Sequence, residues 1–159
     1  MRTYAIVNRK GGVGKTTTAI NLAYVLATSC RLRVLLVDAD GQANATQTLL
    51  PSGEYDGLGA LLRGCVAGVE GLLVHTDVEG LDMLPASDDL WALDLDKLKA
   101  ELRYSAVIQL REELEEEDLY DVMIIDCPPN LSAACTAAIL ASDAVIIPVL
   151  SDACSAVGV

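Results

Sequence analysis

The stretch Arg9-Lys10-Gly11-Gly12-Val13-Gly14-Lys15-Thr16-Thr17 carries the strongest chemical signal in the sequence. It stands between a short apolar run at residues 4–7 and a segment with helical spacing at residues 16–29. Closely spaced glycines let a backbone wrap so that several N–H groups point inward, and the start of a helix adds the positive end of its dipole. The stretch therefore predicts a loop that binds the phosphates of a nucleoside triphosphate.

This loop departs from the ordinary phosphate-binding pattern G-x-x-x-x-G-K-[ST], because Arg9 stands where that pattern has its first glycine. Lys15 is expected to reach the β- and γ-phosphates, and the Thr16 hydroxyl to face Mg²⁺. The alternative is a glycine-rich turn with incidental lysines, which the strand before it and the helix after it make a poor interpretation. The residues expected to contact the nucleotide are Lys10, Gly11, Gly12, Val13, Gly14, Lys15, Thr16 and Thr17.

Short apolar runs alternate with helical segments along the chain, which is typical of an α/β protein. Three of the runs are continuous, as expected for parallel strands that are covered on both faces. The expected strands are residues 4–7, 34–37, 81–84, 122–125 and 144–147, and the expected helices are residues 16–29, 88–117 and 132–141. We therefore predict a mostly parallel sheet flanked by helices, in a single domain that spans residues 1–159.

The helical spacing also predicts which side chains face the core. On the first helix these are Ile20, Ala23 and Leu26, and Trp91 is expected to pack on the long helix. The inward positions of the long helix are Leu95, Leu98, Leu102, Ala106, Leu110 and Leu114. The acidic cluster at residues 112–118 is expected to be a solvated helix end, and residues 51–57 an exposed loop.

Three carboxylates follow the expected strands directly. Asp38 and Asp40 follow the second strand, and Asp126 follows the fourth. Ligand sites of parallel sheets lie beyond the carboxyl ends of the strands, where the phosphate loop also lies. An unpaired carboxylate there carries a desolvation cost that a metal ion or its waters can offset, so the acids predict a magnesium site. For Asp38 or Asp40 alone, a helix cap or a turn is the alternative.

Charge and composition limit the possible functions. Lys+Arg is 11 and Asp+Glu is 23, a formal net charge of −12, so the surface as a whole is a poor nucleic-acid binder, although a local basic patch stays possible. No apolar run approaches the roughly 18 residues of a membrane span, and no signal peptide is expected. Cys30, Cys65, Cys127, Cys135 and Cys154 are expected to be reduced thiols of a cytoplasmic protein. His75 lies outside every motif.

The ordered motifs closely resemble those of ParA-type partition ATPases, which belong to the deviant Walker A class of P-loop NTPases together with MinD and the nitrogenase iron protein. The resemblance covers nearly the whole chain. It rests on residues 5–23 around the phosphate loop, residues 34–46 around Asp38 and Asp40, residues 80–87, residues 120–129 around Asp126, and residues 144–149. The lead-in Asn8-Arg9-Lys10 favours the partition branch over the MinD branch.

This resemblance implies a set of residue roles. Lys10 would be the signature lysine that reaches the partner's phosphates in a dimer, although it could equally be a solvated surface charge. Lys10, Lys15 and Asp40 would be the catalytic residues, with Asp40 positioning the attacking water. Thr16, Asp38 and Asp126 would serve Mg²⁺: Asp126 matches the Walker B position and would act through water, and Asp38 would support the magnesium and the switch loop.

The resemblance also implies partners and a cellular role. ATP and Mg²⁺ would be the cofactors, and two chains would form an ATP-dependent sandwich homodimer. A ParB-like centromere-binding protein would stimulate hydrolysis during plasmid or chromosome segregation. Non-specific DNA binding would use regions absent from this chain, so the full-length protein would be cytoplasmic and nucleoid-associated, without a membrane partner.

Two departures from the family keep alternatives open. The family usually has proline where this chain has Gly41, which leaves the loop freer and puts the hydrolysis rate in doubt. Relatives continue well beyond Val159, so the chain is expected to be the N-terminal portion of a longer fold with an exposed sheet edge. The alternatives are a nucleotide-dependent module without hydrolysis, and a MinD-like positioning ATPase, which would need an amphipathic helix. A metal-cluster protein is disfavoured, because Cys127 and Cys135 lack that branch's sequence context.

Overall fold

The computed structural model describes residues 1–64, 69, 71–87, 90 and 100–151 of the chain. Within these residues a six-stranded sheet has the order β3-β4-β2-β5-β1-β6. Every neighbouring pair is parallel except β3 and β4, which run antiparallel. The strands are β1 (Arg2–Ile6), β2 (Val34–Asp38), β3 (Val74–His75), β4 (Leu81–Leu84), β5 (Val122–Asp126) and β6 (Ala144–Ile146). The mostly parallel α/β sheet predicted from the sequence is confirmed.

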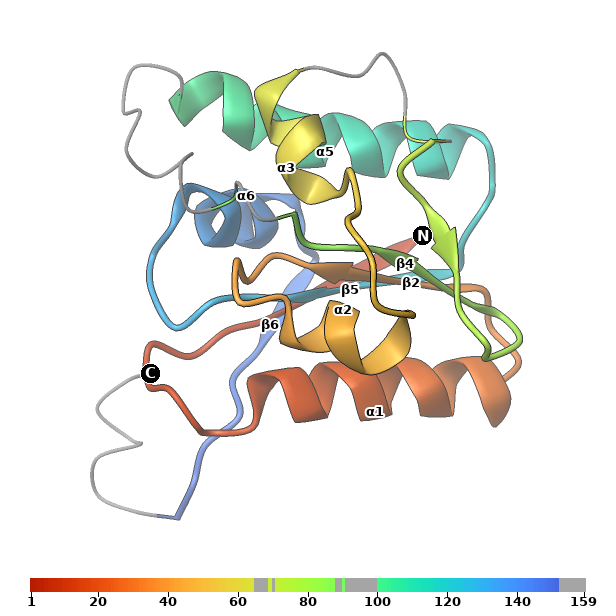
Figure 1. The fold of residues 1–159 in the computed structure, drawn as a ribbon, viewed down its shortest axis with the longest axis horizontal. Helices are drawn as coiled ribbons and strands as arrows, with labels where there is room; N and C mark the ends of the chain where they lie inside the picture. The colour runs from red at the N-terminus through yellow and green to blue at the C-terminus, as the bar shows by residue number, and fades with distance from the viewer. Residues whose placement is uncertain (65–68, 70, 88–89, 91–99, 152–159) are drawn as a thin grey trace.

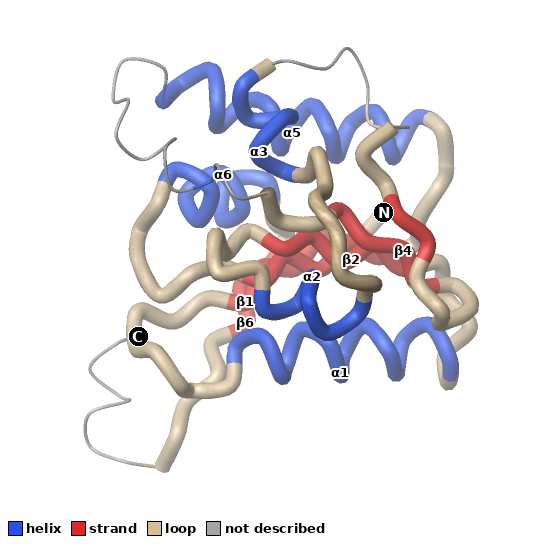
Figure 2. The backbone as a smooth tube through the Cα atoms, in the orientation of Figure 1, coloured by secondary structure: helices blue, strands red, loops and turns tan. Residues whose placement is uncertain are grey.

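Helices cover both faces of this sheet (Figure 1). They are α1 (Lys15–Thr28), α2 (Asn44–Leu49), α3 (Leu58–Arg63), α5 (Ala100–Glu116) and α6 (Ala133–Ala141). Helices α1 and α2 lie against one face, and α3, α5 and α6 lie over the other (Figure 2). The first part of the helix expected at residues 88–117, with Trp91, Leu95 and Leu98, lies outside the described residues, as do Cys65 and Cys154.

Successive side chains of the central strands contribute to two hydrophobic clusters. Leu35 and Val37 of β2 pack with α5 and α6, whereas Val34 and Leu36 pack with α1. All five residues of β2 are buried. Side chains of a strand alternate between the faces of a sheet, so a strand buried on both faces must be apolar throughout. This explains why the central strands are continuous apolar runs.

The inner face of α1 differs in part from the prediction. Ala23 is fully buried as expected, but the other fully buried apolar side chains of the helix are Ala19 and Ala27, while Ile20 and Leu26 are only partly buried. Residues four apart share one face of a helix, so the three alanines form a stripe of small side chains. The larger residues flank the stripe, and the helix backbone can approach the sheet closely.

Strand β6 lies at the edge of the described sheet and exposes Val145. Its start is fixed by Asp143, whose Oδ2 accepts a hydrogen bond of 2.8 Å from the amide of Thr3 in β1. Arg111 of α5 donates from Nη2 to the other Asp143 oxygen at 2.9 Å. This pair joins the helical layer to the sheet edge. None of the helices in the described part of the chain is both long and apolar enough to cross a membrane.

Candidate functional site

The glycine-rich loop joins the end of β1 to the start of α1. Gly12 and Gly14 have φ angles of +75° and +91°, in a region that side chains rarely adopt. A Cβ atom at Gly11, Gly12 or Gly14 would meet nothing within 4 Å, so these positions face open space. Gly14 precedes the 14-residue helix and offers no side chain to cap its first amides. These amides remain available to an anion, as the sequence predicts.

Lys15 is the first residue of α1 and is buried, with a relative exposure of 7%. Its Nζ donates a hydrogen bond of 3.2 Å to the carbonyl of Lys10, so the side chain folds back over the loop. The Lys15 ammonium therefore lies at the mouth of the loop, where phosphates would be expected. Lys10 is half-buried, and its expected role toward a partner's phosphates stays a prediction.

Asn8 fixes the beginning of the loop, a role that the sequence motif alone does not reveal. Its side chain is 1% exposed. Oδ1 accepts a hydrogen bond of 2.8 Å from the amide of Lys10, and Nδ2 donates to the carbonyl of Pro148 at 2.8 Å. Asn8 thus ties the phosphate loop to the segment that follows β6. An asparagine directly after a buried strand was the available signal, but its partner lies far away in the sequence.

The three predicted carboxylates do come together at the carboxyl edge of the sheet. Asp38 and Asp126 are register partners on β2 and β5, and Asp40 follows two residues after Asp38. The amide of Ala39 donates to the carbonyl of Asp126 at 2.9 Å, which joins the two strand ends. All three acids are buried. The negative charges of Asp38 and Asp40 both raise the pKa of Asp126.

Both carboxylate oxygens of Asp38 accept hydrogen bonds from nearby groups of the chain. Its Oδ1 accepts a hydrogen bond from the amide of Asp40 at 3.1 Å, and its Oδ2 accepts from the amide and hydroxyl of Thr46 at 2.9 and 2.8 Å. Burial raises the pKa of Asp38, and the hydrogen bonds from Thr46 and Asp40 oppose this rise. The arrangement fits a role for Asp38 in holding the loop that follows it, between Asp40 and Thr46, better than direct contact with a metal ion.

Asp126 has the opposite environment. Both of its carboxylate oxygens are buried without a hydrogen-bond partner among the described residues. Burial raises the pKa of Asp126 to about 7, and the charges of Asp38 and Asp40 act in the same direction, while the Thr16 hydroxyl and the Lys15 ammonium oppose the rise. A buried carboxylate without donors needs a cation or water to stabilise its charge.

These features fit a magnesium ion. Mg²⁺ usually binds through one or two protein oxygens and keeps waters and substrate phosphates as its other ligands. In the part of the chain that the structure describes, no three His, Cys, Asp or Glu side chains form a metal cage. Thr16 and Asp126 together, beside the phosphate loop, offer the sparse set of ligands that magnesium requires.

Asp40 lies in the loop that joins β2 to α2. Its Oδ1 accepts a hydrogen bond from the amide of Gln42 at 3.0 Å, and its carbonyl accepts from the amide of Ala43 at 2.8 Å. The sequence suggested a loose loop here because Gly41 replaces the family proline. These bonds hold the residues on either side of Gly41, and the freer loop stays a prediction.

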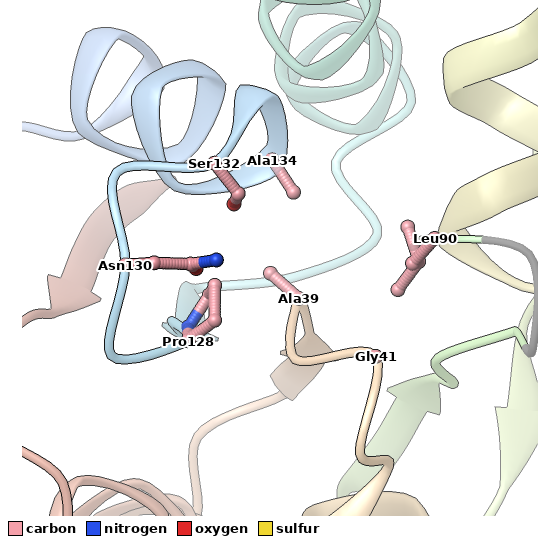
Figure 3. A pocket seen from close by; sticks show the side chains of 7 residues that line it. All are labelled: Ala39, Gly41, Leu90, Pro128, Asn130, Ser132 and Ala134. Atoms are coloured by element: carbon pink, nitrogen blue, oxygen red, sulfur yellow. The ribbon is translucent and has the colours of Figure 1, made fainter. Parts of the chain in front are cut away.

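A small hollow lies between the loops that follow β2 and β5 (Figure 3). Ser132 marks its far side, where its Oγ caps α6 by accepting a hydrogen bond of 3.0 Å from the amide of Cys135. The residues that line the hollow are Ala39, Gly41, Leu90, Pro128, Asn130, Ser132 and Ala134. Because Gly41 has no side chain, it leaves space in the hollow between the loop after β2 and the loop after β5.

Cys127 and Cys135 are buried free thiols, whereas Cys30 is exposed, and Cys127 Sγ donates to the carbonyl of Ile125 at 3.8 Å. The hydrogen bond with Cys135 and burial both raise the pKa of Cys127. These are the small buried side chains that the sequence predicts at both positions.

A family model described as an AAA domain matches residues 1–159. The chain is 43% identical over 152 residues to the chromosome-partitioning ATPase Soj of Thermus thermophilus, an alignment that covers 96% of this chain and 56% of Soj. The chain spans about half the length of the curated relatives it matches.

Two solved structures share its fold. Apo McdA of Cyanothece superposes with a TM-score of 0.88 at 28% identity, and the match covers 99% of this chain and 62% of the McdA chain. Cobyrinic acid a,c-diamide synthase of Mycobacterium smegmatis was solved with a bound ATP analogue and magnesium. It superposes with a TM-score of 0.81 at 36% identity, and the match covers 94% of this chain and 60% of the synthase chain.

Proposed function

This chain belongs to the AAA-domain family, as a ParA-type member, and from that premise we propose that it binds and hydrolyses Mg·ATP in a DNA partition system. The observation that carries the proposal is the buried Asp126 carboxylate, whose oxygens have no hydrogen-bond partner among the described residues and whose charged form the Thr16 hydroxyl and the Lys15 ammonium favour. A similar protein holds an ATP analogue and magnesium. The name of Soj, a chromosome-partitioning ATPase, supports the cellular role.

In the proposed reaction, water attacks the γ-phosphate in line with the leaving oxygen. Lys15 and Lys10 stabilise the negative charge that develops on the phosphates. The Thr16 hydroxyl and the Asp126 carboxylate, the latter through water, would hold Mg²⁺, which would supply positive charge to neutralise the phosphates. Asp40 orients the attacking water, and Asp38 holds Asp40 through the hydrogen bond that its Oδ1 accepts from the Asp40 amide.

The partners are proposals of the same kind. We infer that residues 1–159 act as one nucleotide-binding domain that dimerises around two ATP molecules. A ParB-like protein would stimulate turnover, and DNA contact would use parts of the longer relatives that this chain does not match. The net charge of −12 agrees with that division, because phosphate contacts require Lys and Arg.

Titration with a fluorescent ATP analogue tests the nucleotide site. Lys15→Ala should weaken binding by roughly a hundredfold, since it removes a charge-assisted contact to the phosphates. Arg2→Ala is the matched control, because Arg2 is an exposed cation at the opposite end of β1. Equal affinity in wild type and Lys15→Ala would contradict the assignment of the phosphate loop.

A second candidate is a module that binds nucleotide but hydrolyses it negligibly, which the presence of Gly41 beside Asp40 favours. Phosphate release in a single turnover, measured with and without a ParB-like protein, separates the two functions. Release faster than the uncatalysed rate supports the ATPase. Tight binding without release, even with the partner, supports the module.

A further inference from the structure

The Thr46 side chain joins three separate segments of the protein. It is 5% exposed and lies in the first turn of α2. Its hydroxyl donates to Asp38 Oδ2 at 2.8 Å, and the amide of Ala86, which follows β4, donates to the same hydroxyl at 3.0 Å. Donating and accepting at once is possible for a hydroxyl but not for an aliphatic side chain of the same size.

The Ala86 end of this connection is itself well anchored. The amide of Leu58 donates to the carbonyl of Pro85 at 2.9 Å, and the amide of Gly59 donates to Ser87 Oγ at 3.1 Å. The segment at residues 85–87 is therefore held by α3 on one side and by Thr46 on the other. Thr46 thus connects the end of β2 to a fixed point of the scaffold.

The loop at residues 39–45 is closed by these bonds, and it contains Asp40. At its start the amide of Asp40 is bound to Asp38 Oδ1 at 3.1 Å, and at its end the amide of Thr46 is bound to Asp38 Oδ2 at 2.9 Å. One carboxylate therefore holds both ends of the loop. The hydroxyl of Thr46 links that carboxylate group to the amide of Ala86 in the segment after β4.

We propose that Thr46 is a positioning residue, whose hydroxyl fixes the Asp38 carboxylate and the loop at residues 39–45 so that Asp40 stands where it can orient the attacking water. The inference rests on the proposed hydrolysis. Because Thr46 acts through Asp38 and the loop, its loss should impair turnover far more than nucleotide binding, which depends on the glycine-rich loop and Lys15. A hydroxyl that only stabilised α2 would not separate the two quantities.

The decisive variants are Thr46→Val, which keeps the shape and removes the hydroxyl, and Thr46→Ser, which keeps the hydroxyl. Thr48→Val is the matched control, because Thr48 is an exposed threonine of the same helix whose hydroxyl donates to the carbonyl of Asn44 at 2.7 Å. In Thr46→Val, kcat should fall by roughly tenfold to a hundredfold while the Kd for Mg·ATP changes by less than about twofold. Thr46→Ser and Thr48→Val should retain near wild-type kcat.

Amide hydrogen exchange of the nucleotide-free protein gives an independent measurement. Thr46→Val should speed exchange at residues 39–46 and at Ala86 by roughly tenfold relative to wild type, whereas Thr46→Ser and Thr48→Val should not. Unchanged exchange in Thr46→Val, or equal losses of kcat and affinity, would overturn the positioning role. A wild-type chain that binds Mg·ATP without turnover would instead refute the proposed hydrolysis and the catalytic consequence drawn from it, and exchange would still decide whether Thr46 holds the loop.

Discussion

Asp38 and Asp126 are register partners on adjacent parallel strands, yet Asp38 accepts three hydrogen bonds and Asp126 accepts none from the described residues. The difference follows from what comes after each strand. The chain after Asp38 turns back and presents the amides of Asp40 and Thr46. After Asp126, the amide of Cys127 donates to the carbonyl of Ile6 and not to Asp126. The next two residues are prolines, which have no N–H to donate.

The unpartnered Asp126 carboxylate should destabilise the folded protein, although the proposed magnesium site requires it. The pKa of Asp126 rises from 3.8 to about 7, so the unfolded chain releases this proton at a lower pH than the folded chain. Stability is then lost as pH rises from about 4 to 7. At pH 7.5 without metal, Asp126→Asn should raise the free energy of unfolding by about 2–4 kcal/mol, measured by urea denaturation. The gain should shrink at pH 5, and magnesium should no longer strengthen nucleotide binding.

Asp121→Asn is the matched control, because Asp121 immediately precedes the same strand and has the opposite environment. Hydrogen bonds from the Arg33 side chain and amide lower the pKa of Asp121 to about 2. Its contribution is present above pH 3.8 and is lost as pH falls toward 2, so Asp121→Asn should lower stability at pH 7.5 and leave the magnesium effect intact. Destabilisation by Asp126→Asn in the metal-free protein would contradict the account of the orphaned carboxylate.

His75 should titrate above its ordinary range. Its Nδ1 lies 2.7 Å from Asp82 Oδ1, and the other Asp82 oxygen accepts a hydrogen bond of 2.7 Å from the Tyr120 hydroxyl. The hydrogen bond and charge of Asp82 raise the pKa of His75 above 6.5. The contribution to stability is therefore complete below pH 6.5 and is lost as pH rises through the folded-state pKa.

Nuclear magnetic resonance can measure this pKa directly, since the sequence contains a single histidine. Asp82→Asn should return the pKa of His75 to about 6.5, because it removes the negative charge. Glu79→Gln is the control, since it removes an acid four residues along the chain that is not among the causes of the raised pKa of His75. An equal pKa in wild type and Asp82→Asn would show that the contact does not persist in solution.

The five strands expected from the sequence are all present because each is a mainly apolar run long enough to be recognised, even where, as in β6 at the sheet edge, it is partly exposed. Strand β3 has two residues, and helices α2 and α3 have six each, so none of them repeats a pattern that periodicity could detect. They form because neighbouring segments supply hydrogen bonds. The start of α3, for example, depends on the carbonyl of Pro85.

The candidate site divides in the same way. The phosphate loop and the acids at positions 38, 40 and 126 were predicted because each lies in a contiguous motif whose chemistry is legible locally. Thr46 and Asn8 were not, because their partners Ala86 and Pro148 lie 40 and 140 residues away along the chain. Sequence patterns identify groups that act on a ligand, whereas the groups that hold them in place are specified by the fold.

Gly57 is predicted to be indispensable for the junction between α3 and the segment after β4. A Cβ atom at Gly57 would lie 1.8 Å from the carbonyl oxygen of Pro85, a backbone atom that cannot rotate away. Gly57→Ala must therefore displace α3 or residues 85–87 and weaken the Leu58–Pro85 hydrogen bond. The expected loss in the free energy of unfolding is about 2–4 kcal/mol, measured by urea denaturation.

Gly53→Ala provides the comparison within the same connecting segment. A Cβ atom there would make an ordinary contact of 3.7 Å with the ring of Tyr55, so stability should change by less than about 0.5 kcal/mol. Because Thr46 and residues 85–87 meet through Ala86, Gly57→Ala should also speed amide exchange at Ala86, and Gly53→Ala should not. If both alanine variants unfolded at the same urea concentration as wild type, α3 would not be packed against Pro85 as closely as the structure requires.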